Sequence, residues 1–204
     1  MLDKECEDLF KKAEFHSTHV TAASISSATR LYQAAFLGRS NAGKSSLINA
    51  ILNRKSLVKV SANPGKTRTI NLFYIGENFL FADLPGFGYA RVSKKERKTM
   101  LEMIFDYINH VEELKLVFVL CDSARVLPDE EKELISFCYT TARLPVLVWT
   151  KTDHIKKEDR ARLRKESQKI KGIFPNLNII HSSSKLRQGI SEIQKLVCEV
   201  MTEN

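Results

Sequence analysis

The sequence is poor in cysteine and has no long apolar run. Four of its 204 residues are cysteines, and no two of them form a C-x-x-C pair. This spacing argues against a cysteine metal site, and we expect four reduced thiols that mostly face the core. No run approaches the roughly 18 uninterrupted apolar residues of a membrane-spanning helix. The acidic first residues also lack the apolar centre of a signal peptide, so the sequence predicts a cytoplasmic protein.

Acidic residues are fewer than basic ones. The chain has 32 lysines and arginines against 24 aspartates and glutamates, a formal net charge of +8. Such an excess favours an anionic partner, RNA above all, although an ordinary solvated surface would give the same charge. Hydrophobic residues make up 43% of the chain, which is enough for the core of one domain.

What the sequence does contain is a glycine-rich motif between an expected strand and an expected helix. Residues 38–45 match G-x-x-x-x-G-K-[ST], with the apolar run 31–37 before them and helically spaced apolar residues over 46–52 after them. Glycines let backbone amides converge on a phosphate, and a helix N-terminus adds partial positive charge. The alternative is a glycine turn between two core elements. The nucleotide-binding residues predicted here are Gly38, Arg39, Ser40, Asn41, Ala42, Gly43, Lys44 and Ser45.

Within this loop, two side chains have distinct chemistry. Lys44 is expected to reach the β- and γ-phosphates, and Ser45 to offer its hydroxyl to Mg²⁺.

Three later motifs each follow a short apolar run. We expect them at the carboxyl ends of strands, where open α/β sheets bind ligands. Asp83 would hold Mg²⁺ through water, and Gly86 would approach the γ-phosphate. Asp153 would accept from the N1–H and the amino group of guanine, a pattern that adenine lacks. The binding residues predicted from these motifs are Asp83, Leu84, Pro85, Gly86, Thr150, Lys151, Thr152, Asp153, His181, Ser182 and Ser183.

With these motifs the sequence resembles a translational-type GTPase domain. More closely, it resembles the EngB (YihA/YsxC) family, within the TrmE-Era-EngA-EngB-septin-like GTPases. The residues that carry the resemblance are 38–46, 64–67, 70–71, 83–90 and 150–153. It implies a Ras-like P-loop GTPase domain of the α/β class, with a six-stranded, mostly parallel sheet and helices on both faces. We expect this G domain over residues 31–204, with residues 1–30 as an N-terminal extension packed on it.

The resemblance also implies a first switch loop in the polar segment 61–69. Thr67 is expected to ligate Mg²⁺ when the γ-phosphate is present, with Thr69 as the competing choice. An ordinary surface turn is the alternative for this segment. The GTP-binding residues expected here are Gly65, Lys66, Thr67, Arg68 and Thr69.

Catalysis is expected to rest on Lys44, Thr67 and Gly86. Ras-like GTPases place a water-positioning Gln after that glycine, whereas this chain has Phe87. Intrinsic hydrolysis should therefore be slow, on the order of 10⁻⁴ to 10⁻² s⁻¹, until a partner orders the switches. In relatives that resemble this family, an Asn at the position of Asn41 helps to hold K⁺ beside the phosphates, so we hypothesise K⁺ stimulation; the alternative is that Asn41 bonds its own loop.

The resemblance implies a monomeric switch that binds the large ribosomal subunit or its precursor, acts in its assembly, and is needed for normal cell division and septation. Two expected helices carry basic residues that fit such a partner or a plain solvated surface. One opens with the capping box at 93–96, and the other spans 155–171. A non-hydrolysing GTP-dependent scaffold and a P-loop small-molecule kinase are the alternatives. Residues 150–153 argue against the kinase.

Overall fold

A seven-stranded sheet runs through the described part of the chain, in the strand order β1-β3-β4-β2-β5-β6-β7. The computed structural model describes residues 4–26, 29–58, 69–77, 79–88 and 93–202. The strands are β1 (Glu14–His19), β2 (Tyr32–Gly38), β3 (Ile70–Ile75), β4 (Phe79–Asp83), β5 (Leu114–Asp122), β6 (Leu144–Thr150) and β7 (Asn178–His181). Strands β4, β2, β5, β6 and β7 run parallel to their neighbours in this order. β3 is antiparallel to β4 and to β1.

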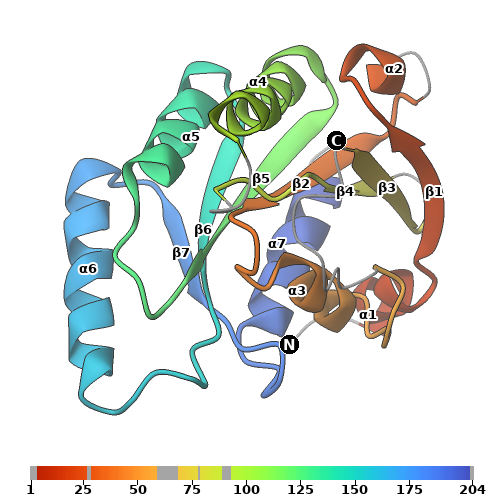
Figure 1. Ribbon diagram of the computed structural model, residues 1–204. Helices are drawn as coiled ribbons and strands as arrows, with labels where there is room; N and C mark the ends of the chain where they lie inside the picture. Colours follow the sequence, from red (N-terminus) through yellow and green to blue (C-terminus); the bar gives the residue numbers. More distant parts are fainter. Residues whose placement is uncertain (1–3, 27–28, 59–68, 78, 89–92, 203–204) are drawn as a thin grey trace.

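Helices cover both faces of the sheet, as predicted (Figure 1). They are α1 (Lys4–Lys11), α2 (Ala23–Ser26), α3 (Lys44–Ile51), α4 (Lys94–His110), α5 (Asp129–Thr140), α6 (Asp159–Ile173) and α7 (Ile190–Thr202). The apolar faces of α4, α5 and α6 share one hydrophobic core with the sheet, and those of α1, α3 and α7 share the other. The central strands are therefore buried on both sides, which is why they read as continuous apolar runs.

The sheet has one strand more than the six predicted. The extra strand is β1, which lies in the N-terminal segment and pairs with the edge strand β3. Its sequence, EFHSTH, is polar and only partly buried, so no apolar alternation marks it as a strand. Phe10 and Ile25 from the same segment lie fully buried, one in each core. The division of the chain at residue 30 remains a prediction.

Two helix starts show how local chemistry sets the boundaries. The capping box of α4 is present, because the Ser93 hydroxyl accepts from the Glu96 N–H at 3.2 Å and the Glu96 carboxylate accepts from the Ser93 N–H at 3.0 Å. The second basic helix, expected from residue 155, begins instead at Asp159. The residues before it form turns, with the Asp159 N–H donating to the Lys156 carbonyl at 3.1 Å.

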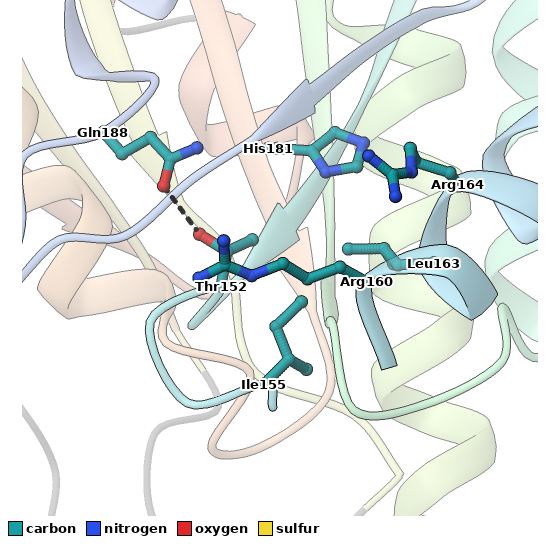
Figure 2. A pocket seen from close by; sticks show the side chains of 7 residues that line it. All are labelled: Thr152, Ile155, Arg160, Leu163, Arg164, His181 and Gln188. Carbon is teal, nitrogen blue, oxygen red and sulfur yellow. Dashed lines mark hydrogen bonds between the residues drawn. The ribbon is translucent and has the colours of Figure 1, made fainter. Parts of the chain in front are cut away.

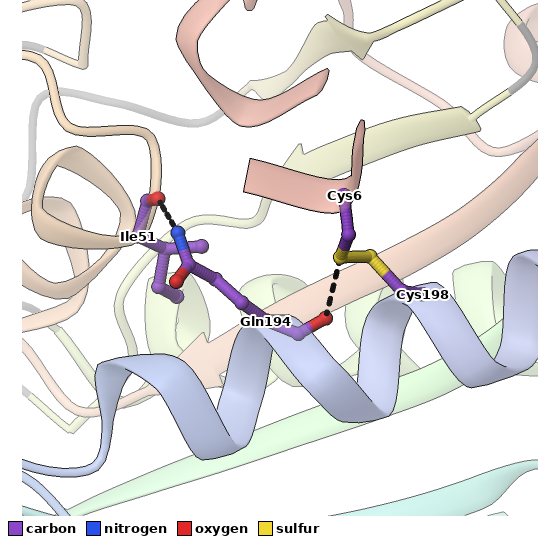
Figure 3. Close-up of a disulfide and its surroundings, with 4 residues drawn as sticks. All are labelled: Cys6, Ile51, Gln194 and Cys198. Carbon is purple, nitrogen blue, oxygen red and sulfur yellow. Dashed lines mark hydrogen bonds between the residues drawn. A yellow bond between two sulfur atoms is a disulfide. The ribbon is translucent and has the colours of Figure 1, made fainter. Parts of the chain in front are cut away.

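The expectation of four reduced cysteines is wrong for two of them. Cys6 of α1 and Cys198 of α7 form a disulfide, with their Cα atoms 6.3 Å apart (Figure 3). They are 192 residues apart in sequence and meet because α1 packs against α7, a tertiary contact that cysteine spacing does not reveal. Cys121 and Cys138 are free and buried, as predicted.

In the part of the chain that the structure describes, none of the helices combines the length and the hydrophobicity needed to cross a membrane.

Candidate nucleotide-binding site

The predicted motifs meet at the carboxyl edge of the parallel strands. The loop after β2 (residues 38–45, the phosphate loop) leads into α3. The loops after β4, β6 and β7 carry the other three motifs, and the one after β6 (residues 150–153) is called the base loop. Because β2 lies between β4 and β5, its loop is placed at the centre of this edge. Residues far apart in sequence therefore converge on the phosphate loop, which is the location expected for a ligand in an open α/β sheet.

The phosphate loop has the backbone that a phosphate cradle requires. Gly43 is the N-cap of α3 and has φ 89° and ψ 15°, a left-handed conformation that glycine adopts without strain. No side chain caps the helix, and the first turn closes with the Leu47 N–H donating to the Gly43 carbonyl at 2.9 Å. The leading amides of α3 thus remain available to an anion, beside the positive end of the helix dipole.

Lys44 and Asp83 form an ion pair across the site. Both side chains are largely buried, with 12% of the lysine and 9% of the aspartate side chain exposed. The hydroxyl of Ser45 has no hydrogen-bond partner among the described residues. A lysine, a carboxylate and a hydroxyl at the start of α3 form a donor set suited to phosphate and to a hard cation.

The loop after β4 is fixed to the phosphate loop. The Ser40 N–H donates to the Phe87 carbonyl at 2.9 Å, and the Phe87 N–H donates to the Gly38 carbonyl at 3.3 Å. A Cβ atom at Gly86 would lie 3.2 Å from the backbone of Ser40, so a larger residue here would press on the phosphate loop and glycine leaves this close approach free of contact. Leu84 and the Phe87 side chain are buried in the core. The side chain after Gly86 therefore faces inward and is unable to hold a water molecule.

Thr150 and Lys151 connect the base loop to the phosphate loop. The Thr150 hydroxyl donates to the carbonyl of Ala42 at 2.6 Å, and it also lies 3.3 Å from the carbonyl of Cys121. Lys151 Nζ donates to the carbonyl of Asn41 at 2.6 Å and to Asp122 Oδ2 at 2.9 Å. Movement of either loop would break these bonds, so the two binding loops form one unit.

Asp153 is held by a residue of the loop that follows β7. The Ser183 hydroxyl donates to Asp153 Oδ1 at 2.7 Å, and His154 Nε2 lies 3.3 Å from Oδ2. The hydrogen bond from Ser183 lowers the pKa of Asp153, which keeps the carboxylate charged at neutral pH. An oriented carboxylate at the edge of the site is the group needed to accept two donors from guanine.

His181 and Ser182 lie in other surroundings. The Ser182 hydroxyl donates to the Gln188 carbonyl at 3.1 Å and so braces the loop from inside. The His181 ring faces α6, with Nε2 3.4 Å from the hydroxyl of Ser167, and burial lowers its pKa. On the α6 side the Thr152 hydroxyl donates to Gln188 Oε1 at 3.2 Å. The side chains of His181, Ser182 and Thr152 thus support the base loops from behind.

Arg39 is engaged outside the phosphate loop. Its guanidinium donates to Glu131 Oε1 at 2.9 Å and binds Glu130, both of α5, and Glu130 also binds Arg97 of α4. Sequence reasoning did not identify these glutamates, nor Asp122 as the partner of Lys151. Asp122 could have been found, because it ends a buried strand at the same edge as the other motifs.

Part of the predicted site lies outside the described residues. These positions are Gly65, Lys66, Thr67 and Arg68. Thr69, the competing choice for the switch threonine, is described and directly precedes β3.

Comparison with known proteins gives one family. The model of a family described as "50S ribosome-binding GTPase" matches residues 33–151. The probable GTP-binding protein EngB of Leptospira biflexa is 38% identical over 168 residues, which cover 82% of this chain and 79% of that protein. The protein of the same name from Clostridium kluyveri is 41% identical over 183 residues, covering 88% and 84% of the two chains.

Solved structures confirm the predicted fold. The crystal structure of a probable GTP-binding protein EngB aligns with a TM-score of 0.68 at 22% identity, covering 84% of this chain and all (100%) of that one. Era, in complex with MgGDPNP and a segment of 16S ribosomal RNA, aligns with a TM-score of 0.63 at 21% identity, covering 83% and 56%. The structural likeness gives the P-loop GTPase fold, and the sequence identity over most of both chains gives the family. The chain belongs to the EngB family of GTP-binding proteins.

Proposed function

We propose that this protein binds GTP through the residues predicted above and hydrolyses it slowly to GDP and phosphate. The observation that carries the proposal is that two recognition groups lie at one loop, residues 38–45. Lys44 stands at the start of α3, where this loop ends, and Asp153 lies in the loop after β6, which Lys151 joins to the first loop through its hydrogen bond to the Asn41 carbonyl. Lys44 would bind the terminal phosphates, and Asp153 would select guanine. A scaffold without hydrolysis remains the second candidate, because Phe87 is buried where a water-positioning side chain is expected.

Magnesium fits the donor set at the phosphate loop. Mg²⁺ prefers oxygen ligands and is commonly held by one or two protein groups together with substrate phosphates. The Ser45 hydroxyl and, through water, Asp83 would hold the ion here, and Thr67 is proposed as a further ligand. The ion would neutralise charge on the β- and γ-phosphates. Lys44 would exchange Asp83 for phosphate oxygens when the nucleotide arrives.

We further propose that the partner is the large ribosomal subunit or its precursor. The net charge of +8 favours an anionic partner, and α6 exposes several lysines and arginines. The family description names 50S ribosome binding, and the Era structure contains ribosomal RNA. These observations support the proposal of a monomeric, cytoplasmic switch that times a step of subunit assembly. A requirement in cell division and septation would then be a consequence of this role.

Co-sedimentation with purified ribosomal subunits in K⁺ buffer tests this proposal. The protein is compared with a non-hydrolysable GTP analogue, with GDP and without nucleotide. We expect it to pellet with the large subunit in the analogue and to lose this binding in GDP. The matched control is Asp153→Asn, which should need at least about tenfold more analogue for the same response. Absence from the pellet in every state would contradict the ribosomal role.

Single-turnover release of phosphate separates the hydrolase from the scaffold. Slow release that accelerates with large subunits is expected for the hydrolase. No release, even with subunits, would favour the scaffold.

A further inference from the structure

A cavity of about 230 Å³ lies behind the guanine loops, between them and the first turns of α6 (Figure 2). It is formed by the base loop after β6, the end of β7 and the loop that follows β7. Its lining residues are Thr152, Ile155, Arg160, Leu163, Arg164, His181 and Gln188. None of the three groups expected to contact the nucleotide most directly, Lys44, Lys151 and Asp153, lines it. The cavity shares Thr152 and His181 with the predicted GTP-binding set, but neither Lys44 nor Asp153, the two groups that carry the GTP proposal, lines it.

The cavity is positively charged. Arg160 and Arg164 stand four residues apart on one face of α6, both exposed, and neither guanidinium has a partner among the described residues. In Figure 2 they extend from the helix over the hollow. Arg162, on another face, is by contrast paired with Asp159 and donates to the Ser123 carbonyl at 3.2 Å. No lining side chain is acidic, so the field inside attracts anions.

The rest of the lining fits a flat group with polar edges. Leu163 is buried and, with Ile155, provides an apolar surface. Around it stand a hydroxyl, an amide and an imidazole from Thr152, Gln188 and His181, which can donate and accept hydrogen bonds. Unpaired nucleobases are recognised in this way, by stacking on guanidinium or aromatic planes and by hydrogen bonds to their edges.

We infer that this cavity binds one unpaired nucleotide of single-stranded RNA, with the phosphate on Arg160 and Arg164 and the base inside against Leu163. The inference rests on the proposed function, because an RNA-rich partner is what would present such a nucleotide. It adds the place of contact and the chemical form of the RNA. A paired base is hidden in its helix and would not enter.

A chain of hydrogen bonds connects the lining of the cavity to Asp153, the residue proposed to recognise guanine. Thr152 precedes Asp153 directly, and its hydroxyl donates to Gln188. The backbone of Gln188 exchanges hydrogen bonds of 3.2 and 3.1 Å with that of Ser183, whose hydroxyl holds Asp153. A nucleotide that contacts Thr152 and Gln188 would therefore change the position of Asp153. Since such coupling is reciprocal, RNA should change the affinity for GDP by the same factor as GDP changes the affinity for RNA.

Fluorescence anisotropy with a labelled single-stranded RNA of about ten nucleotides tests the inference. Arg160→Ala and Arg164→Ala should each weaken binding about tenfold or more and lower the salt dependence by about one charge. The control is Lys165→Ala, which removes the same charge from α6 outside the cavity and should have a smaller effect. An oligomer of abasic nucleotides should bind about 5- to 100-fold more weakly than the RNA. A duplex of equal length should also bind more weakly.

The outcomes separate this inference from the proposed function. If the wild-type protein binds RNA but all three variants lose affinity equally, or if duplex and abasic oligomers bind as well as the single strand, the cavity is not the site and the ribosomal role is untouched. If an acidic peptide displaces the RNA from the wild type but not from Arg160→Ala, the cavity takes a protein partner instead. If the protein binds neither RNA nor ribosomal subunits, the proposed ribosomal role itself fails. Unchanged GTP affinity of the variants verifies their fold.

Discussion

The hydroxyl of Ser183 donates a hydrogen bond of 2.7 Å to Oδ1 of Asp153. The two residues follow different strands, β7 and β6, and the bond joins the two loops expected to hold the guanine base. It fixes the orientation of the carboxylate and lowers its pKa. A charged, oriented acceptor is therefore present before any nucleotide binds.

Replacing Asp153 should change the base that is preferred. In Asp153→Asn the amide nitrogen would face the donors of guanine, so GTP affinity should fall at least about tenfold, since charge-assisted hydrogen bonds contribute roughly 1.5–3 kcal/mol. Xanthosine triphosphate has a carbonyl where guanine has an amino group and should bind the variant better than the wild type. Calorimetric titration with both nucleotides measures this. Undiminished GTP binding would overturn the base assignment.

Ser183→Ala provides the graded companion to that variant. It keeps the Asp153 carboxylate and removes only the hydrogen bond from Ser183 that orients it, so we expect a loss of about 2- to 10-fold in GTP affinity. A loss equal to that of Asp153→Asn would mean that the alanine disrupts the loop itself.

The sequence was sufficient to predict the fold and the edge of the sheet at which these motifs meet, because phosphate and base recognition demand particular residue types at particular spacings. A glycine with φ 89° and a lysine beside it are recognisable without coordinates, and so are strands buried on both faces. What escaped prediction depends on tertiary contacts. A strand-like piece is expected within residues 1–30, but its place in the sheet depends on pairing with β3, and the partners of Arg39 come from α5, about 90 residues further along. No local pattern encodes such contacts.

Lys44 should be indispensable for nucleotide binding. Lys44→Ala removes the ammonium group that we propose binds the terminal phosphates, and it leaves the largely buried Asp83 without its ion-pair partner. We expect GTP and GDP affinity to fall at least about a hundredfold, as two charge-assisted contacts are lost. Fluorescent nucleotide titration measures the affinity, and circular dichroism checks the fold. Retained affinity would contradict the phosphate role.

The cysteines should divide into two kinds in a thiol titration. Without reductant, the unfolded protein should show two thiols, from Cys121 and Cys138, and the reduced protein four. In the folded state the two free cysteines should react slowly, because burial raises the pKa of each to about 12. Cys6→Ser is the control, which should show one additional thiol at Cys198. Four thiols in the unreduced wild type would contradict the disulfide.

The same bond should affect stability. Removing a native disulfide commonly costs about 2–5 kcal/mol, so reduction should lower the midpoint of thermal unfolding by roughly 4–20 °C. Cys6→Ser should be insensitive to reductant. The bacterial cytoplasm keeps most thiols reduced, so the disulfide and the proposed cytoplasmic location are compatible only if the reduction potential of the bond lies below that of the compartment. Measuring this potential against a glutathione buffer tests whether both hold.

His181 should make stability depend on pH. Burial lowers the pKa of His181 below the ordinary 6.5, so the unfolded chain binds a proton that the folded chain does not. The folded state is therefore favoured above pH 6.5 and loses stability as pH falls from there through the lowered pKa, by at most about 1.4 kcal/mol per pH unit. In His181→Gln the free energy of unfolding should decline less between about pH 7.5 and 5. Denaturant titrations at intervals of roughly half a pH unit measure it. His19, whose pKa burial also lowers, would account for any residual slope.

Asn41 should determine the response to K⁺. The side-chain amide of Asn41 makes no hydrogen bond among the described residues, while its backbone carbonyl accepts from Lys151 Nζ. The side-chain oxygen is therefore available to a cation beside the phosphate loop. Asn41 has φ 67°, and Asn41→Gly can keep this conformation while removing the oxygen. We expect wild-type hydrolysis to be about tenfold faster in KCl than in NaCl, as one extra charge-assisted contact in the transition state would give, and the glycine variant to show no such difference. Equal wild-type rates in the two salts, measured with and without large ribosomal subunits, would rule out K⁺ as a cofactor. Equal stimulation of the variant would place the ion elsewhere.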